Sequence, residues 1–156
     1  MPIVSCNIHC TGTHTECISH IQESKFKITD KCPRGLIPSY LITVEPEPAH
    51  SIKDSYHCDI SGSNVIGKEG IESKISTSCD SLIIRTLPND ESKLSRNYDK
   101  VSAPFLTSDA IYYINQLGVK HLLVDLPSID KADDGGVLGN HRLFFSKGDT
   151  ISEMLY

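Results

Sequence analysis

The segment HCTGTHTECISH, residues 9–20, packs three histidines, two cysteines and a glutamate into twelve positions. Imidazole, thiolate and carboxylate groups are the donors that Zn²⁺ and similar divalent metals take in proteins. A single His or Cys is more often an ordinary packed or solvated residue, but six donors this close together favour a metal site. A catalytic metal centre and a closed structural zinc site both stay open here, although no second pair of cysteines follows to complete a structural site.

The residues around this segment have the pattern of an α/β fold. β-Branched residues predict a strand at 2–8, and compact apolar runs predict strands at 38–44, 81–86 and 119–125. Residues 107–117 carry the strongest helical pattern, with apolar side chains on one face. A helix that is followed within two residues by an apolar strand is typical of a mixed α/β sheet.

Local signals mark the ends of this helix. Thr107 or Ser108 can accept a hydrogen bond from the free amides of its first turn, and Gly118 can end it. A shorter helical pattern covers residues 67–75, where Gly70 costs about 1 kcal/mol relative to alanine. We therefore expect one well-formed helix and one short helix.

Composition and charge exclude several classes of protein. With 15 Lys and Arg against 20 Asp and Glu, the chain has a net charge of −5, and we expect no nucleic-acid partner. The longest apolar run, residues 110–114, is far shorter than the about 20 residues of a membrane-spanning helix. The first residues lack the basic and apolar regions of a secretory signal, and the six cysteines fit free thiols or metal ligands better than disulfides. These features predict a cytoplasmic protein without a membrane partner.

Three motifs carry a resemblance to a known family. Residues 10–20 resemble the HxGTHxDxPxH signature of the cyclase-like metal-dependent hydrolases, the family of bacterial kynurenine formamidase and isatin hydrolase. Residues 123–130, LVDLPSID, resemble the DxPSxD turn of this family, and His141 and Glu153 resemble its late His and Glu. The motifs follow in the family's order, so the similarity extends over nearly the whole chain.

The resemblance implies both a fold and an activity. The implied fold is α/β, a mixed β-sheet with flanking helices of the swivelling β/β/α type. The implied enzyme is a metal-dependent hydrolase that cleaves the carbon–nitrogen bond of a linear or cyclic amide, as a formamidase does, through a metal-activated water. It would take a small-molecule amide and one or two divalent ions, Zn²⁺ or Mn²⁺, and would form a homodimer or another homo-oligomer. A catalytically impaired metal-binding protein on the same fold remains the alternative.

The resemblance also assigns roles to individual residues. His14 falls on a metal-binding histidine, and Glu16 falls where the family has an aspartate that can bridge two metals. His141 and Glu153 fall on ligands of the second metal. His20 falls on the last histidine of the signature, which implies a proton donor and acceptor in catalysis.

Cys10 is the main departure from the signature. It stands where the family has its first histidine ligand, and a thiolate there would make the site softer. His9 is one residue away, and in a strand its side chain would point to the opposite face. We therefore predict that Cys10 is the ligand.

The remaining expectations concern the turn and the length of the chain. We expect Asp125, Pro127, Ser128 and Asp130 to form a turn at the end of a strand, whose side chains cap backbone amides rather than contact substrate. The chain is expected to form one domain over residues 1–156 that is short for its family at both ends. Two interpretations stay open, a fragment and a natural short form completed by another subunit. Both predict exposed apolar surface along the sheet.

Overall fold

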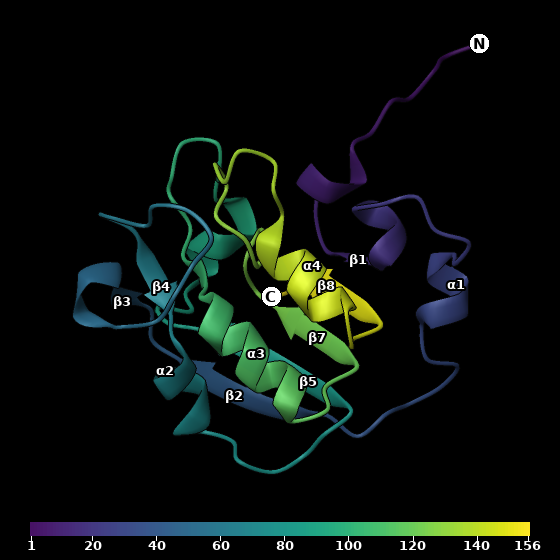
Figure 1. Ribbon diagram of the computed structural model, residues 1–156. Helices are drawn as coiled ribbons and strands as arrows, with labels where there is room; N and C mark the ends of the chain where they lie inside the picture. The colour runs from purple at the N-terminus through teal and green to yellow at the C-terminus, as the bar shows by residue number, and fades with distance from the viewer.

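The computed structural model describes the backbone of residues 1–156 and every side chain except that of Cys10. A five-stranded mixed sheet forms its centre (Figure 1). The strands are β1 (His14–Glu16), β2 (Tyr40–Val44), β5 (Ser81–Thr86), β7 (His121–Val124) and β8 (Thr150–Glu153). They stand in the order β1-β8-β7-β5-β2, where β1 is antiparallel to β8 and all other neighbours are parallel. The predicted mixed α/β fold is thus confirmed.

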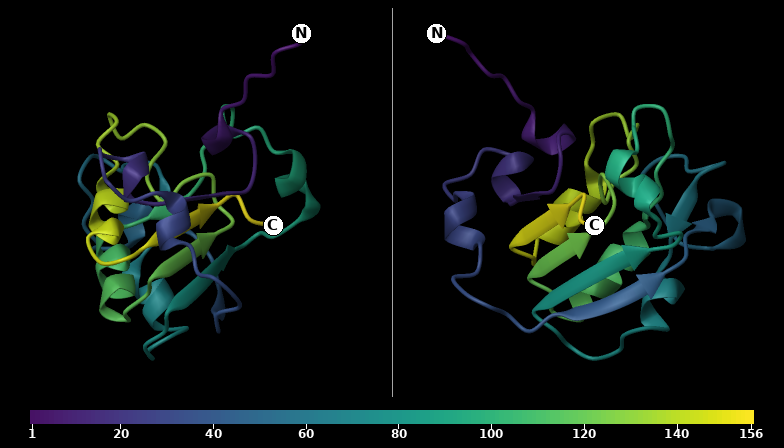
Figure 2. Two further views of the ribbon diagram at one scale, coloured as in Figure 1. Left: turned by 90° about the vertical axis from the view of Figure 1, so that its right-hand side faces the viewer. Right: turned by 180° about the vertical axis from the view of Figure 1, so that it is seen from behind.

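Helices cover one face of this sheet, as the front and side views show (Figures 1 and 2). The helices are α1 (Ile28–Lys31), α2 (Lys68–Glu72), α3 (Ser108–Gln116) and α4 (Gly139–Phe145). Helix α3 packs between α2 and α4, whereas the single turn α1 lies beyond the β8 side of the sheet. The main core lies between the helices and the strands, where Leu82, Ile114 and Leu122 are fully buried.

The predicted end signals of α3 are present. The Thr107 hydroxyl accepts a hydrogen bond from the backbone N–H of Ala110 at 3.1 Å, which satisfies one free amide of the first turn. Gly118 follows the helix with φ of +81°, a conformation that favours glycine. Of the two residues considered for the cap, the structure uses Thr107.

A second, smaller sheet packs beside the first. It has the order β3-β4-β6, with β3 (Glu47–Pro48), β4 (Asn64–Ile66) and β6 (Phe105–Leu106). Val65 and Phe105 bury their side chains in a separate apolar cluster. Short 3-10 turns complete the chain: η1 (Ile8–Cys10), η2 (Ile18–His20), η3 (Ala49–Ser51) and η4 (Glu91–Ser95).

Most predicted elements are found where the apolar patterns placed them. The strands expected at 38–44, 81–86 and 119–125 are β2, β5 and β7. The helices expected at 107–117 and 67–75 are α3 and α2. Periodicity was sufficient here because each of these elements buries one apolar face against the main core.

The strand predicted at 2–8 is wrong. Residues 1–7 form no helix or strand among the described backbone, and η1 begins at Ile8. Ile3 and Val4 are almost fully exposed. β-Branched residues favour a strand only where a neighbouring strand and a buried face are available, and this segment has neither in the described structure.

Two elements near the C-terminus have no clear sequence signal. Helix α4 follows Leu138, whose φ of +51° is left-handed, and β8 has only four residues. The backbone N–H groups of Asn140 and His141, in the first turn of α4, donate to the side chain of Asp130. Asp130 lies before the loop that leads into α4. Because this helix start depends on a distant side chain, local capping rules do not find it.

The other face of the sheet is open. Viewed from behind, no helix of the described chain crosses strands β2, β5, β7 and β8 (Figure 2). Leu41, Ile83 and Leu123 are neighbours across three of these strands, and Leu41 is 57% exposed. The expected apolar surface along the sheet is therefore present. Of the described helices, none has the length and apolar character to cross a membrane.

Candidate metal centre

Strand pairing brings three predicted site residues together. Strands β1 and β8 pair so that His14 lies directly opposite Glu153. Glu16, two residues further along β1, points to the same face as His14. Nε2 of His14 lies 3.6 Å from Oε2 of Glu153 and 3.9 Å from Oε2 of Glu16. These side chains meet at the edge of the sheet face that the helices cover.

His141 reaches the same point from helix α4. Its Nε2 lies 2.7 Å from Oε1 of Glu16 and 3.5 Å from Oε1 of Glu153. Glu153 is held in place by the backbone N–H of Ile129, which donates to Oε1 at 2.9 Å. Glu16, His141 and Glu153 are all buried and offer ligand atoms within 4.8 Å of one another.

The residue before Cys10 supplies a further ring nitrogen. The side chain of Cys10, the predicted ligand, lies outside the described part of the structure. Nδ1 of His9 lies 3.1 Å from Oε2 of Glu16, and His9, His14 and Glu16 form a second group with ligand atoms within 4.8 Å. The expectation that His9 points away is wrong, because turn η1 replaces the strand alternation on which it depended. We call His9, His14, Glu16, His141 and Glu153 the His/Glu cluster.

The His/Glu cluster contains buried polar atoms that suit a cation. Five of them make no hydrogen bond to any described group: Nδ1 of His9, Nε2 of His14, Nε2 of His141, and both carboxylate oxygens of Glu16. They lie close together but without hydrogen-bond geometry, and each unsatisfied atom costs about 1–3 kcal/mol. One or two divalent cations would satisfy them all, and nitrogen and oxygen donors suit such ions. The residues therefore fit a metal.

Asp130 orients the ring of His141. Its Oδ2 accepts hydrogen bonds from Nδ1 of His141 at 2.7 Å and from the backbone N–H of the same residue at 3.1 Å. Its Oδ1 accepts from the Tyr56 hydroxyl at 2.9 Å and from the backbone N–H of Asn140 at 2.8 Å. A carboxylate that takes one ring N–H directs the other nitrogen towards a metal, and this contact is common at metal-binding histidines.

The carboxylates around His141 change its titration. Burial favours the neutral ring, but Asp130, Glu153 and Glu16 outweigh burial and hold the pKa of His141 well above its usual value. For Glu16, burial works towards a higher pKa, yet the contacts with His141 and the other histidines lower it. Without a metal, the proton on His141 thus balances the negative charge of the surrounding carboxylates. A bound cation would balance the same charge in its place.

His20 lies on the outer side of the His/Glu cluster. Its Nε2 is 3.4 Å from Oε2 of Glu16, and its ring stacks on His9 with centroids 4.0 Å apart. Its side chain is 27% exposed, more than those of His14 and His141. Burial lowers the pKa of His20 more than the nearby Glu16 raises it, so the neutral ring is favoured.

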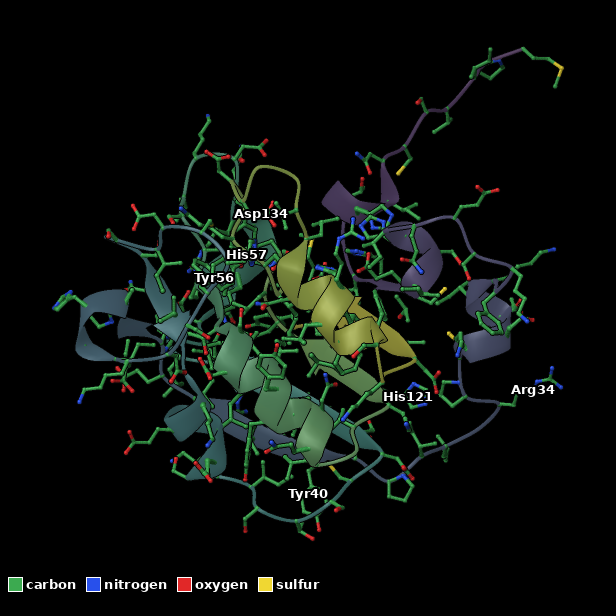
Figure 3. The ribbon with its side chains drawn as sticks, viewed as in Figure 1. Arg34, Tyr40, Tyr56, His57, His121 and Asp134 are labelled. Atoms are coloured by element: carbon green, nitrogen blue, oxygen red, sulfur yellow. The ribbon has the colours of Figure 1, made fainter. Side chains whose placement is uncertain are left out.

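A second acidic group beside the cluster does not suit a metal. His57, Asp130 and Asp134 lie close together, and Figure 3 shows His57 and Asp134 with Tyr56 near the start of α4. Asp134 accepts hydrogen bonds from the backbone N–H groups of Gly136 and Leu138 and pairs with His57 at 3.2 Å. Because its oxygens already have donors, this group organises the loop before α4.

The turn at 125–130 both caps backbone amides and lines a cavity. Asp125 accepts from the backbone and hydroxyl of Thr86 and forms a buried ion pair with Lys93 at 2.6 Å. This side chain caps a backbone amide as expected. Ser128 also caps as expected, because its hydroxyl accepts a hydrogen bond from the backbone N–H of Asp130 at 3.1 Å. Together with Pro127 it lines a cavity of about 520 Å³ beside His9. The sequence alone therefore missed their position next to the His/Glu cluster.

Known proteins resemble this chain over much of its length. The family model described as "Putative cyclase" matches residues 2–131. A kynurenine formamidase of Bacillus cereus is 28% identical over 138 residues, which cover 88% of this chain and 56% of that relative. The chain thus spans a little over half the length of this curated relative.

Solved structures share the fold. A potential metal-dependent hydrolase with cyclase activity matches 97% of this chain and 64% of its own, with a TM-score of 0.61 and 20% identity. Isatin hydrolase A from Labrenzia aggregata, bound to benzyl benzoate, matches 94% of this chain and 60% of its own, with a TM-score of 0.51 and 17% identity. The predicted cyclase-like type of α/β fold is confirmed by this similarity.

Proposed function

This chain belongs to the cyclase family, and from that premise we propose that it is a metal-dependent hydrolase that cleaves the carbon–nitrogen bond of an amide, as a formamidase does. The observation that carries the proposal is the convergence of buried, unpaired donor atoms in the His/Glu cluster. The similarity to kynurenine formamidases supports an N-formyl arylamine as the kind of substrate.

We propose that four predicted residues hold the metal. His14 and Glu153 face each other across β1 and β8, and His141 and Glu16 complete the set from α4 and β1. Glu16 belongs to both groups of candidate ligands, so its carboxylate would help to hold the metal whether the site takes one ion or two. Nitrogen and oxygen donors suit both Zn²⁺ and Mn²⁺. The role of Cys10 remains a prediction.

The metal and the protein have separate tasks in this proposal. When bound, a divalent metal polarises a carbonyl oxygen and lowers the pKa of water. Hydrolysis joins the water oxygen to the carbonyl carbon and breaks the carbon–nitrogen bond, so one proton must move from the water to the amine. His20 suits this transfer because its ring favours the neutral state, is partly exposed and lies beside Glu16.

The cavity beside the His/Glu cluster suits a small aromatic amide. Its volume of about 520 Å³ lies within the usual range of about 300–1,000 Å³ for small-molecule sites. Tyr98, Pro104 and Met154 give it an apolar lining, and Arg96 adds a positive charge. We place the aryl ring of the substrate against these apolar side chains, with its amide towards His9.

The remaining features of this proposal concern assembly and location. We propose a single domain over residues 1–156 that forms a homodimer or another homo-oligomer, supported by the open sheet face around Leu41. A molar mass from light scattering tests the oligomer, and a single cooperative unfolding transition tests the domain. The cytoplasmic location stays a prediction, which cell fractionation tests.

An assay of the metal-loaded chain tests the activity. We expect hydrolysis of an N-formyl arylamine that falls about 10²–10⁴-fold in His20→Ala, because a general acid–base group contributes that much. His14→Ala should lose activity together with bound metal. His50→Ala, which removes an exposed histidine from η3, should keep the full rate. Metal binding without turnover would contradict the proposal and favour the non-catalytic alternative.

A further inference from the structure

We propose that His9, through Nδ1, is the metal ligand that this chain uses at the place where the signature motif has a histidine and this chain has Cys10. The inference rests on the proposed metal-dependent function and assigns one more residue to it. It concerns a position that the motif does not name, because His9 lies one residue before the signature begins.

The position of Nδ1 carries the inference. This atom is buried, makes no hydrogen bond to any described group, and lies 3.1 Å from Oε2 of Glu16. Nε2 of His14 and the Glu16 carboxylate complete a group of three donors within 4.8 Å. A buried ring nitrogen without a partner costs about 1–3 kcal/mol, and a shared cation would remove that cost. His9 thus faces the same space as two proposed ligands.

The backbone explains why His9 can reach this space. Residues 8–10 form turn η1, and the Asn7 side chain accepts a hydrogen bond from the backbone N–H of His9 at 3.2 Å. The Thr11 hydroxyl donates to the backbone oxygen of Asn7 and closes the same turn. A short, capped turn therefore directs the ring of His9 inward immediately before β1 begins.

Neighbouring rings hold the imidazole of His9 in one orientation. It meets His14 edge to face, with centroids 4.9 Å apart and an interplanar angle of 88°. It stacks on His20 with centroids 4.0 Å apart and an angle of 28°. Contacts on two sides reduce the entropy that the ring loses when it binds a metal. They also place His9 between a proposed ligand and the proposed proton-transfer residue.

A simpler role for His9 would be that of an ion-pair partner of Glu16. In that case a bound metal would take the place of His9 as the partner of Glu16, and His9 would contribute nothing to metal affinity. A direct ligand instead adds a donor to the metal, so its loss should weaken binding at least as much as loss of an outer hydrogen bond, about 10–100-fold. The two roles therefore differ in a measurable way.

Titration of the full-length, metal-free chain with Co²⁺, followed by absorbance, tests this inference. Co²⁺ reports its ligands through its visible bands, and a thiolate ligand adds strong near-ultraviolet charge-transfer absorbance. We expect visible bands without that thiolate feature, the same spectrum and affinity in Cys10→Ser, and at least about tenfold weaker binding in His9→Ala. His50→Ala is the matched control for the loss of one histidine.

The outcomes separate this inference from the proposed function. Unchanged Co²⁺ affinity in His9→Ala, or a thiolate band that disappears in Cys10→Ser, would overturn the role of His9 and leave the metal site standing. No Co²⁺ binding by the unmodified chain would overturn both proposals. Circular dichroism of His9→Ala checks its fold, and His9→Gln provides a second variant with a polar side chain.

Discussion

The candidate metal centre has two halves that the fold supports differently. The anchored half comprises Asp130, His141 and Glu153, and the N-terminal half comprises His9, His14, Glu16 and His20. The anchored side chains are all buried and come from α4, β8 and the turn before them. The N-terminal side chains come from η1, η2 and a three-residue strand, and His9 and His20 remain partly exposed.

A single strand joins the N-terminal half to the sheet. Strand β1 pairs only with β8 in the described sheet, where the hydroxyls of Thr15 and Ser152 lie 2.8 Å apart. The Thr13 hydroxyl donates to the backbone oxygen of Met154 at 2.6 Å. A seven-residue helix and a strand inside the sheet hold one side of the site, while the other side depends on a three-residue edge strand and two short turns. We infer that a bound metal joins the two halves.

A substitution in the core beneath the anchored half should have the largest effect on the free energy of unfolding. Leu122 in β7 is fully buried, so Leu122→Ala should lower the free energy of unfolding by about 2–5 kcal/mol. Leu41→Ala removes the same atoms from the open face and should cost less than about 1 kcal/mol. Urea unfolding of both variants measures the difference. Equal losses would show that the two faces of the sheet are packed alike.

Metal should stabilise the molecule, chiefly by holding the N-terminal half. At about 100 times its dissociation constant, Mn²⁺ should raise the free energy of unfolding by about 2.7 kcal/mol, and a chelator should reverse this gain. Hydrogen exchange, read by mass spectrometry, should slow most strongly in residues 9–20 and least in β5. Equal slowing throughout the chain would contradict the different support of the two halves.

Removal of the charge behind His141 should weaken metal binding without direct loss of a proposed ligand. Asp130→Asn should reduce the affinity for Mn²⁺ about 10–100-fold, equal to about 1.4–2.7 kcal/mol, because the His141 ring loses its charged acceptor. Asp133→Asn makes the same change at an exposed position of the same loop and should have no such effect. Calorimetric titration measures both affinities, and equal values would remove Asp130 from its positioning role.

The smallest effect is expected at the contact between β1 and β8. Thr15→Val removes one side of the Thr15–Ser152 contact and should cost about 0.5–1 kcal/mol. A double-mutant cycle with Ser152→Ala isolates the interaction between the two residues. A coupling energy near zero would show that the backbone pairing alone holds β1 in place.

Local patterns predicted the parts of the fold that bury a continuous apolar face. Strands β5 and β7 and helix α3 have this property, and their residues repeat with the period of the element. Helix α4 begins where Asp130 accepts its first amides, and β8 takes its place beside β7. Such features depend on contacts between distant parts of the chain, so a local reading of the sequence could not find them.

The same distinction applies to the candidate site. The signature motif named His14 and Glu16, and the structure places both beside His141 and Glu153. The prediction that His9 points away from the site depends on a strand, whereas the chain forms a turn there. The density of potential metal ligands in residues 9–20 was the signal in the sequence that pointed to His9.

The contact of Tyr56 with Asp130 joins residues 74 positions apart. No local pattern reports a hydrogen bond between residues so distant in the chain.

We infer that the two halves meet to hold a divalent metal, and the metal content per chain tests this inference most directly. The chain and its Glu16→Gln variant would be loaded with Zn²⁺ or Mn²⁺, desalted, and measured by inductively coupled plasma mass spectrometry. Glu16 offers a ligand atom to both candidate groups, so loss of its negative charge should weaken metal binding by either group. We predict one or two ions retained per unmodified chain and a clear loss in Glu16→Gln. Equal metal in the two proteins, or none in the unmodified chain, would contradict the account.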